Sequence, residues 1–311
     1  MAFTAQDVKK LREMTNVGMM DCKKALQATD GDMDKAVDWL REKGLAKAAK
    51  KAGRVAAEGM AYATVCPECG VAAVVEVNCE TDFCANSAPF QTFVKDLATV
   101  VMKQNPADVD ALMNCTYPGS TLTVAGILPE KVMAIGENLQ IRRFARFDSN
   151  TSVAYVHAGG SHGVLVNLAV EGDADVTELG KNVAMQIAAM NPKYWDKANV
   201  PQADVDHEMS VQLALMETDP KMASKPAAVK EKIAAGKLAN FYKENCLLQM
   251  DFVRSDLFTG SVEGYIADAA KKLGVKVTFV DAVHFIKGEG IEKKVDDFAA
   301  EVAAQIANAG K

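Results

Sequence analysis

The sequence predicts an α+β protein whose core is a duplicated unit of an antiparallel hairpin and a covering helix. Residues 61–78 and residues 153–170 each contain two short β-branched runs joined by a turn. In both places a stretch with apolar residues at helical spacing follows. A single hairpin is at best marginally stable in water, so we expect the two units to share one core.

The composition of the 311-residue chain fits a protein of about two domains with a sizeable core. Hydrophobic residues make up 49% and charged residues 24%, which is ordinary for a globular protein. The net charge of −6 argues against a nucleic-acid partner, which would require Lys and Arg to displace counterions. No stretch has the roughly 18 apolar residues of a membrane span, and the first residues lack signal-peptide features. We therefore expect a cytoplasmic protein without a membrane partner.

The cysteines and histidines indicate no metal centre. The seven cysteines are an odd number with scattered spacing, which argues against a disulfide framework and favours reduced thiols: 22, 66, 69, 79, 84, 115 and 246. The four histidines lie far apart in the sequence, which argues against a histidine-built metal site: 157, 162, 207 and 284.

The N-terminal segment predicts a module of three short helices over residues 1–45. Thr4 and Asp7 have the spacing of a capping box at the start of the first helix. Gly44 is expected to end the third helix. Such a small module has a thin core. Residues 46–57 are rich in Ala and Lys and predict a linker.

The duplicated core is expected to fall into two subdomains, residues 58–148 and residues 149–282. In each, an acidic turn leads from the hairpin into the covering helix. The first helix has inward-facing apolar residues at helical spacing: Phe90, Phe93, Val94, Leu97, Val100 and Val101. The second has a similar set: Leu179, Val183, Ile187 and Met190. Within the first subdomain, residues 105–114 and 130–135 predict helices and residues 139–147 a strand.

The second subdomain contains an antiparallel helical hairpin over about residues 196–245. Apolar residues recur at three- and four-residue steps in both arms, and prolines mark the turn between them. The sequence leaves open whether this hairpin packs on the body or projects from it. A helix over 262–273 and a strand over 275–281 follow. A C-terminal module over 283–311, with a last helix from residue 294 to 308, completes the chain.

Two long segments resemble the motifs of a known family. The first, LREMTNVGMMDCKKAL, covers residues 11–26, and the second, EVNCETDFCAN, covers residues 76–86. Both resemble the motifs of the elongation factor Ts family, in the same order and at a similar separation. The family's tail pattern also appears, as GEGIEK over residues 288–293. Two long motifs in order are far more specific than one short motif. The sequence departs from the family pattern at Cys84, where a Val is usual.

The resemblance implies a translation elongation factor that promotes GDP release and GTP exchange on elongation factor Tu. The family binds this GTPase in its GDP-bound and nucleotide-free forms and displaces Mg²⁺ and the elements that hold the nucleotide. It also implies a UBA-like N-terminal module. No covalent chemistry is implied, so we expect no enzyme activity, catalytic residue, metal, cofactor or small-molecule substrate.

The resemblance also implies which residues contact the GTPase. The intruding segment that displaces Mg²⁺ is Thr81, Asp82 and Phe83, with Phe83 as the wedge. Five further positions match contact points of the family: Met19, Met20, Ile135, Gly136 and His157.

Each of these residues also has a structural interpretation. Pattern alone favours Phe83 as a core residue under the helix of residues 90–101, and Asp82 as a cap. The pattern is equally compatible with methionines that plug the three-helix module and with methionines that contact a partner. His157 is more often an ordinary strand residue, Ile135 a core residue and Gly136 a helix stop.

The motif Cys66-Pro67-Glu68-Cys69 supports an alternative function. A CxxC pair is found in thiol-redox proteins and in half of some zinc sites. Here it lies at a hairpin turn, where no helix N-terminus lowers a thiol pKa, and no second CxxC follows. Cys79 and Cys84 are the nearest additional ligands. A third interpretation is a passive scaffold that binds the GTPase without changing GDP release.

Overall fold

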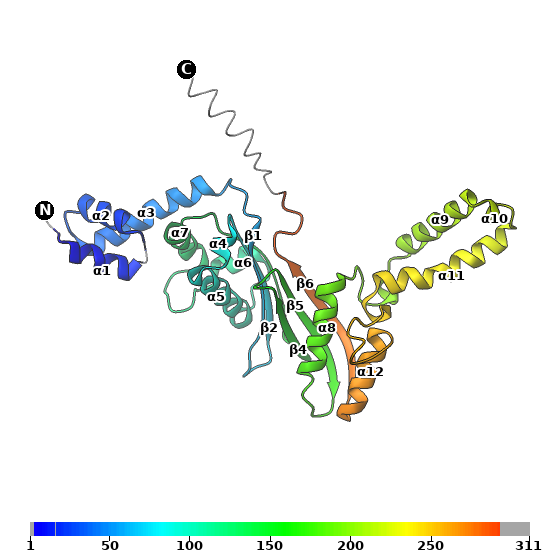
Figure 1. Cartoon of the computed structure of the whole chain (residues 1–311). Coiled ribbons are helices and arrows are strands. Elements are labelled where there is room, and N and C mark those ends of the chain that lie inside the picture. Colours follow the sequence, from blue (N-terminus) through cyan, green and yellow to red (C-terminus); the bar gives the residue numbers. More distant parts are fainter. Residues whose placement is uncertain (1–2, 16, 293–311) are drawn as a thin grey trace, which may run out of the picture.

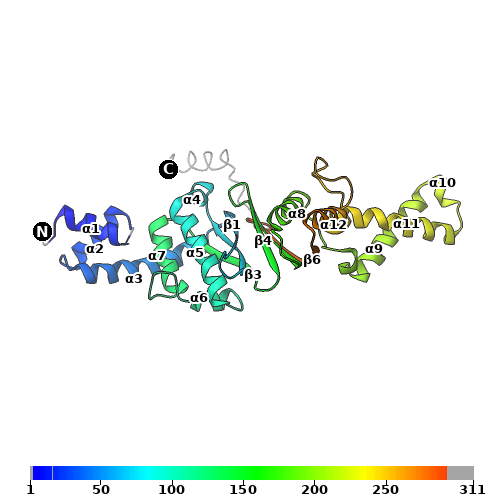
Figure 2. The same cartoon turned by 90° about the horizontal axis from the view of Figure 1, so that it is seen from below.

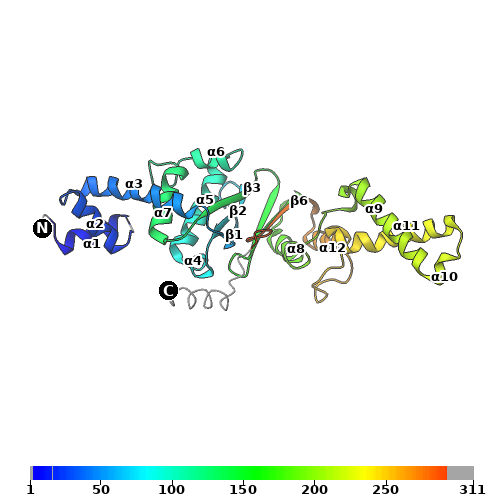
Figure 3. The ribbon, with the colours of Figure 1, turned by 90° about the horizontal axis from the view of Figure 1, so that it is seen from above.

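The computed structural model describes residues 3–15 and 17–292. Its parts follow one another along an elongated molecule (Figure 1). A helical bundle lies at one end, two β-sheets with their helices lie in the middle, and a helical arm lies at the other end, as the views from below and above also show (Figures 2 and 3). The mixture of helices with antiparallel sheets confirms the α+β class. No helix in the described part of the chain is long and apolar enough to cross a membrane.

Three helices form the N-terminal bundle: α1 (Ala5–Thr15), α2 (Met19–Ala28) and α3 (Met33–Lys51). The capping box at the start of α1 is confirmed. The Thr4 N–H donates to Asp7 Oδ2 at 2.7 Å, and the Asp7 N–H donates to Thr4 Oγ1 at 3.3 Å. The core of the bundle is small and consists of Val8, Leu11, Val17, Cys22, Ala25, Leu26, Ala36, Leu40 and, from a neighbouring helix, Met133.

The prediction that Gly44 ends the third helix is wrong, because α3 continues through it to Lys51. Gly44 is buried where α3 crosses α7 (Val124–Ile135). A Cβ atom there would lie 3.4 Å from the Pro129 carbonyl oxygen. The absence of a side chain thus lets the two helices approach closely, and this packing outweighs the weak helix propensity of glycine. About half of the expected linker is therefore helix.

The first half of the core is a sheet with strand order β1-β2-β3 and its helices. The strands are β1 (Glu58–Val65), β2 (Ala72–Cys79) and β3 (Gln140–Phe147). Between β2 and β3 lie α4 (Asp82–Ala85), α5 (Ala88–Gln104), α6 (Val109–Asn114) and α7. The helix expected at 130–135 begins earlier, at Val124, because the Thr123 side chain caps it by accepting the Gly126 N–H at 3.2 Å.

The second half repeats this arrangement with strand order β4-β5-β6. The strands are β4 (Thr151–His157), β5 (His162–Glu171) and β6 (Lys276–Ile286), and the helices α8 (Thr177–Met190) and α12 (Val262–Leu273) accompany them. The strand expected at 275–281 runs to Ile286, because it pairs with β5 along its whole length. Residues 283–286 therefore belong to the sheet and not to a separate C-terminal module.

The duplication extends to the third strand of each sheet. The pairing of β2 with β3 shifts register between Glu76 and Val77, and the pairing of β5 with β6 shifts between Asn167 and Leu168. The two sheets pack face to face through a small apolar cluster of Ala63, Ala72, Val74 and Leu165. Helices α5 and α8 cover the outer faces (Figure 1). The expectation of one shared core is therefore wrong in part: each half has its own core under its helices, and the small cluster between the sheets joins the two. The division into subdomains at residues 148 and 149 remains a prediction.

The helical hairpin projects from the body as an arm, which answers the question that the sequence left open (Figure 1). It consists of α9 (Gln202–Thr218), α10 (Pro220–Ala223) and α11 (Ala227–Asn245), and short 3₁₀ turns at Lys197–Asn199 and Leu247–Gln249 flank it. Few of its side chains are buried, namely Met216, Lys230 and Ala234. The last helix expected at 294–308 lies outside the described residues.

Candidate partner-binding site

Phe83 lies on the surface, on the one-turn helix α4 that directly follows strand β2. Its side chain is 87% exposed, whereas the next two residues, Cys84 and Ala85, are buried. Thr81 begins this turn, and its hydroxyl oxygen accepts the Cys84 N–H at 3.1 Å. The interpretation of Phe83 as a core residue is therefore wrong. Because its neighbours anchor the turn from inside, the aromatic ring points outward.

The carboxylate of Glu137 fixes the turn that presents Phe83. It accepts the N–H groups of Glu80 and Thr81 at 2.9 and 3.0 Å and the Thr81 hydroxyl at 2.5 Å. Hydrogen bonds to an ionised acceptor are stronger than neutral ones. Sequence reasoning missed Glu137, which is 56 residues from Thr81 and gave no signal beyond its place after a helix stop.

A second set of polar contacts ties the same turn to the end of α3. The Asn138 N–H donates to Glu80 Oε1 at 2.7 Å, and the Asn138 side chain donates to the Arg54 carbonyl oxygen at 2.8 Å. The Arg54 guanidinium also lies 3.4 Å from the Glu80 carboxylate. Three segments that are distant in sequence therefore meet behind Phe83.

Ile135 and Gly136 lie next to this network, at the end of α7. Ile135 is half-buried against the core of the first half. Gly136 is exposed and ends α7 with a φ of 91°, a left-handed conformation that glycine adopts without strain. The Lys51 ammonium donates to its carbonyl oxygen. The structure thus brings Ile135 and Gly136 together with Thr81 and Phe83.

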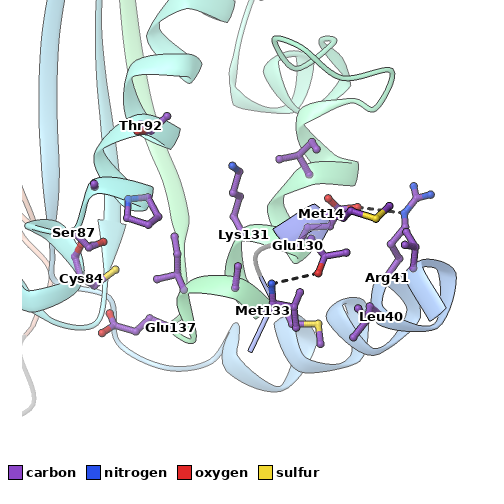
Figure 4. A pocket seen from close by; sticks show the side chains of 18 of the residues that line it. Met14, Leu40, Arg41, Cys84, Ser87, Thr92, Glu130, Lys131, Met133 and Glu137 are labelled. Atoms are coloured by element: carbon purple, nitrogen blue, oxygen red, sulfur yellow. Dashed lines mark hydrogen bonds and ion pairs between the residues drawn. The ribbon is translucent and has the colours of Figure 1, made fainter. Parts of the chain in front are cut away.

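A groove of about 970 Å³ separates the bundle from the first half of the core (Figure 4). Phe83 and Ile135 line it on one side, and Met14 and Val17 of the bundle line it on the other. Arg41 and Glu130 form an ion pair of 3.3 Å across its wall (Figure 4). Burial raises the pKa of Glu130 above its usual value. The groove thus combines apolar contact area with a few charges, as partner-binding surfaces do.

Met19 and Met20 lie on α2, away from the walls of the groove. Their side chains are 43% and 63% exposed, so the interpretation of these methionines as plugs of the bundle is wrong. Two neighbouring exposed methionines form an adaptable apolar surface. They provide a second exposed patch, separate from Phe83.

His157 lies at the exposed end of β4, and its Nδ1 is 2.8 Å from the Tyr155 hydroxyl. Three of the histidines, although two of them are distant from the third in sequence, lie close together in the fold, because β5 lies between β4 and β6. The ring of His162 is 5.9 Å from that of His157 and 5.2 Å from that of His284. Burial lowers the pKa of His284 to about 4, so this ring is neutral at pH 7.

Comparison with known proteins identifies the family. A family model described as "Elongation factor TS" matches residues 80–289. A protein named elongation factor Ts from Clostridioides difficile is 48% identical over 308 residues, which cover 98% of this chain and 99% of the relative. Proteins of the same name from Trichlorobacter lovleyi and Paramagnetospirillum magneticum are each 43% identical, over 98% and 97% of this chain and of each relative, respectively. The chain belongs to the elongation factor Ts family.

The segment matched by the elongation factor Ts model begins and ends at structurally important positions. It starts at Glu80, the first residue of the turn that carries Phe83, and ends at Glu289. The Glu289 carboxylate lies 3.1 Å from Arg143, so the end of the matched segment is tied to β3. The matched segment therefore covers the core from the end of β2 onwards, and the full-length relatives extend the match over the first hairpin and the bundle.

The cysteine arrangement does not support the alternative function of a CxxC protein in this family member. Cys66 and Cys69 lie at the tip of the β1–β2 hairpin, where a hydrogen bond from Cys69 lowers the pKa of the Cys66 thiol. Cys79 pairs with Glu58 at the other end of the hairpin, about 23 Å away along the strand. Cys79 and Cys84 therefore cannot complete a site with Cys66 and Cys69.

Proposed function

We propose that this member of the elongation factor Ts family promotes GDP release and GTP entry on elongation factor Tu in the cytoplasm. Phe83 inserts beside the Mg²⁺ and phosphate site of that GTPase. The observation that carries the proposal is the 87% exposure of Phe83 on a turn held by the Glu137 carboxylate. A rigid, exposed aromatic side chain is the usual energetic anchor of a protein interface.

The chemistry of the nucleotide site explains why a wedge is sufficient. Mg²⁺ requires near-ideal octahedral geometry, so a small displacement of its surroundings costs much nucleotide affinity. The coupling is reciprocal, because a factor that weakens nucleotide binding is itself bound more weakly when nucleotide is present. Incoming GTP therefore releases the factor without a covalent step, and the factor is not an enzyme.

The other residues extend the contact. Thr81 positions the turn, and exposed Asp82 places a negative charge beside Phe83. Ile135 and Gly136 form the neighbouring edge of the same surface. Further contacts with the GDP-bound and nucleotide-free GTPase come from the exposed patch of Met19 and Met20 and from His157.

The wedge is tested by Phe83→Ala. Loss of an interface anchor costs about 2–4 kcal/mol, so GDP release at saturating factor should slow by about 100-fold. Stopped-flow measurement of fluorescent GDP leaving elongation factor Tu gives this rate. Leu273→Ala, at another exposed apolar residue, is the matched control and should leave the rate unchanged. An unchanged rate for Phe83→Ala at saturation contradicts the wedge.

The bundle contact is tested by the double variant Met19→Ser, Met20→Ser. Because these side chains lie apart from Phe83, we expect an affinity for the GTPase about 10-fold weaker, the effect of a peripheral contact, with the maximal release rate retained. Met190→Ser, at an exposed methionine of α8, is the control. Titration calorimetry checks the affinity, and an affinity equal to that of the control removes the bundle from the interface.

A further inference from the structure

Two thiols and a carboxylate converge beside the turn that carries Phe83. One Sγ atom each of Cys79 and Cys84 and one oxygen of Glu137 all lie within 4.8 Å of one another. Cys79 is fully buried and Cys84 is 6% exposed. The three residues come from the end of β2, from α4 and from the turn after α7, so the cluster joins three separate elements (Figure 4 shows Cys84 and Glu137).

We propose that Cys79, Cys84 and Glu137 bind one Zn²⁺ ion. Cysteine sulfur and glutamate oxygen are both established zinc ligands. Thiolates select Zn²⁺ over the harder Mg²⁺, which favours oxygen ligands. The site is therefore chemically distinct from the magnesium site of the proposed GTPase partner.

The geometry requires little movement. Zinc–sulfur bonds of about 2.3 Å in a tetrahedral site place two sulfur atoms roughly 3.8 Å apart. The ligand atoms, which are at most 4.8 Å apart, therefore need to approach by about 1 Å, within reach of small side-chain rotations. The Thr81 carbonyl oxygen, 3.2 Å from Cys79 Sγ, or a water molecule supplies the fourth ligand.

The charges balance when the ion binds. Without metal, the Cys79 thiol donates to the Thr81 carbonyl oxygen at 3.2 Å, so it carries its proton. Binding of Zn²⁺ replaces one proton on each thiol, and both protons pass to water, so no oxidant or reductant is needed. Glu137 keeps its hydrogen bonds to Glu80 and Thr81, because each carboxylate oxygen can accept more than one partner.

The ion would link the three elements that support Phe83. Glu137 already fixes the turn, and a shared ion would add a connection to β2 and α4. The consequence for nucleotide exchange rests on the proposed function. The binding of the metal does not, because it depends on these three side chains alone.

The test uses cobalt as a spectroscopic probe in the reduced full-length chain. Cys66→Ser and Cys69→Ser are introduced together, so that the hairpin-tip thiols cannot contribute. In this background we expect one Co²⁺ per chain, a thiolate-to-cobalt charge-transfer band and its loss when Zn²⁺ is added. Zn²⁺ should also raise the melting temperature by about 5 °C or more, because it binds only the folded chain.

Matched variants decide the outcome. Cys84→Val in the same background should lose the cobalt band and the thermal shift, and Cys115→Ala, which removes a thiol outside the cluster, should keep both. Circular dichroism checks the fold, and Cys84→Ala replaces the valine variant if packing is disturbed. Absence of the band in the background protein, or an equal band in Cys84→Val, overturns the proposal. GDP release is measured separately, so its loss through Phe83→Ala tests only the exchange function.

Discussion

The two halves of the core share a scaffold but differ in the segment that follows the second strand. After β2, the extra turn α4 presents Phe83 to solvent. After β5, residues 172–176 lead into α8 without a helical turn, and the last of them, Val176, is buried. The two halves therefore have similar sheets, and the additional turn α4 distinguishes the half that carries the candidate site.

The halves also differ at their register shifts. In the first half, the buried carboxylate of Glu76 accepts hydrogen bonds from Arg142 at 2.9 Å, from Arg143 at 2.6 Å and from the Gly288 N–H at 2.8 Å. In the second half, Asn167 stands at the corresponding position, and its amide oxygen has no hydrogen-bond partner among the described residues. In the first half, the charged Glu76 side chain thus links the sheet to the segment after β6. In the second half, an uncharged side chain occupies the corresponding position.

The largest expected effect tests this difference in charge. Glu76→Gln removes the charge that pairs with Arg142 and Arg143. Because breaking a buried ion pair is strongly destabilising, we expect the free energy of unfolding to fall by about 3–5 kcal/mol. The corresponding change in the second half, Asn167→Ala, should cost about 1 kcal/mol, because one of its polar atoms is already unsatisfied. Urea denaturation measures both. Equal losses of unfolding free energy in the two variants would show that the buried charge of Glu76 does not make the first half more sensitive than the second.

A smaller effect is expected from loosening the added turn. Glu137→Ala removes the three hydrogen bonds that hold Glu80 and Thr81. GDP release at saturating factor should slow by about 10-fold, roughly the effect of one lost charged hydrogen bond.

The control for this variant comes from the second half. Asp175→Ala removes the carboxylate that accepts the Thr177 N–H at 2.8 Å at the corresponding connection. It should not alter release. Both proteins are first stripped of zinc with a chelator, so that the result reports on the hydrogen bonds alone. An unchanged rate of GDP release for Glu137→Ala would mean that the turn does not need these three hydrogen bonds.

The smallest expected effect is an acid sensitivity confined to the second half. The pKa of His284 is about 4 in the folded chain and about 6.5 when unfolded. The unfolded chain therefore binds the proton more readily, and stability present above pH 6.5 is lost as the pH falls towards 4. After allowance for contact with solvent, the loss is about 1 kcal/mol.

Thermal unfolding between pH 7 and pH 4.5 checks this dependence. His284→Gln should reduce the slope of stability with pH, whereas His207→Gln, on the projecting arm, should not. An identical slope in the two variants would place the acid sensitivity elsewhere.

The sequence predicted the repeated hairpins and helices well because their apolar periodicity is local. The covering helix α5 has all six predicted inward-facing residues buried, from Phe90 to Val101. In α8 the same prediction is wrong for Met190, which is exposed at the end of the helix. Local patterns failed where tertiary packing decides. Gly44 continues a helix because α7 packs against it, and β6 extends to Ile286 because β5 offers a partner strand.

The candidate site was predictable in part. Periodicity alone placed Phe83 in the core, because a short turn has no period that separates inward from outward positions. The family resemblance, not the pattern, singled it out. Glu137 could not be predicted, since a carboxylate after a helix stop is ordinary until the fold places it against Thr81. The three clustered histidines likewise depend on the strand order.

The unbroken helix α3 has a mechanical consequence for recognition. Its 19 residues span roughly 28 Å, and Met133 of α7 is packed into the bundle that it carries. The bundle is thus joined to the core by a stiff spacer. The methionine patch and Phe83 are therefore held at a fixed distance. Under the proposed function, a partner bound at one of these surfaces meets the other at a raised effective concentration. A partner whose two binding surfaces are spaced differently would lose that advantage, so the proposed function makes the length of α3 a determinant of specificity.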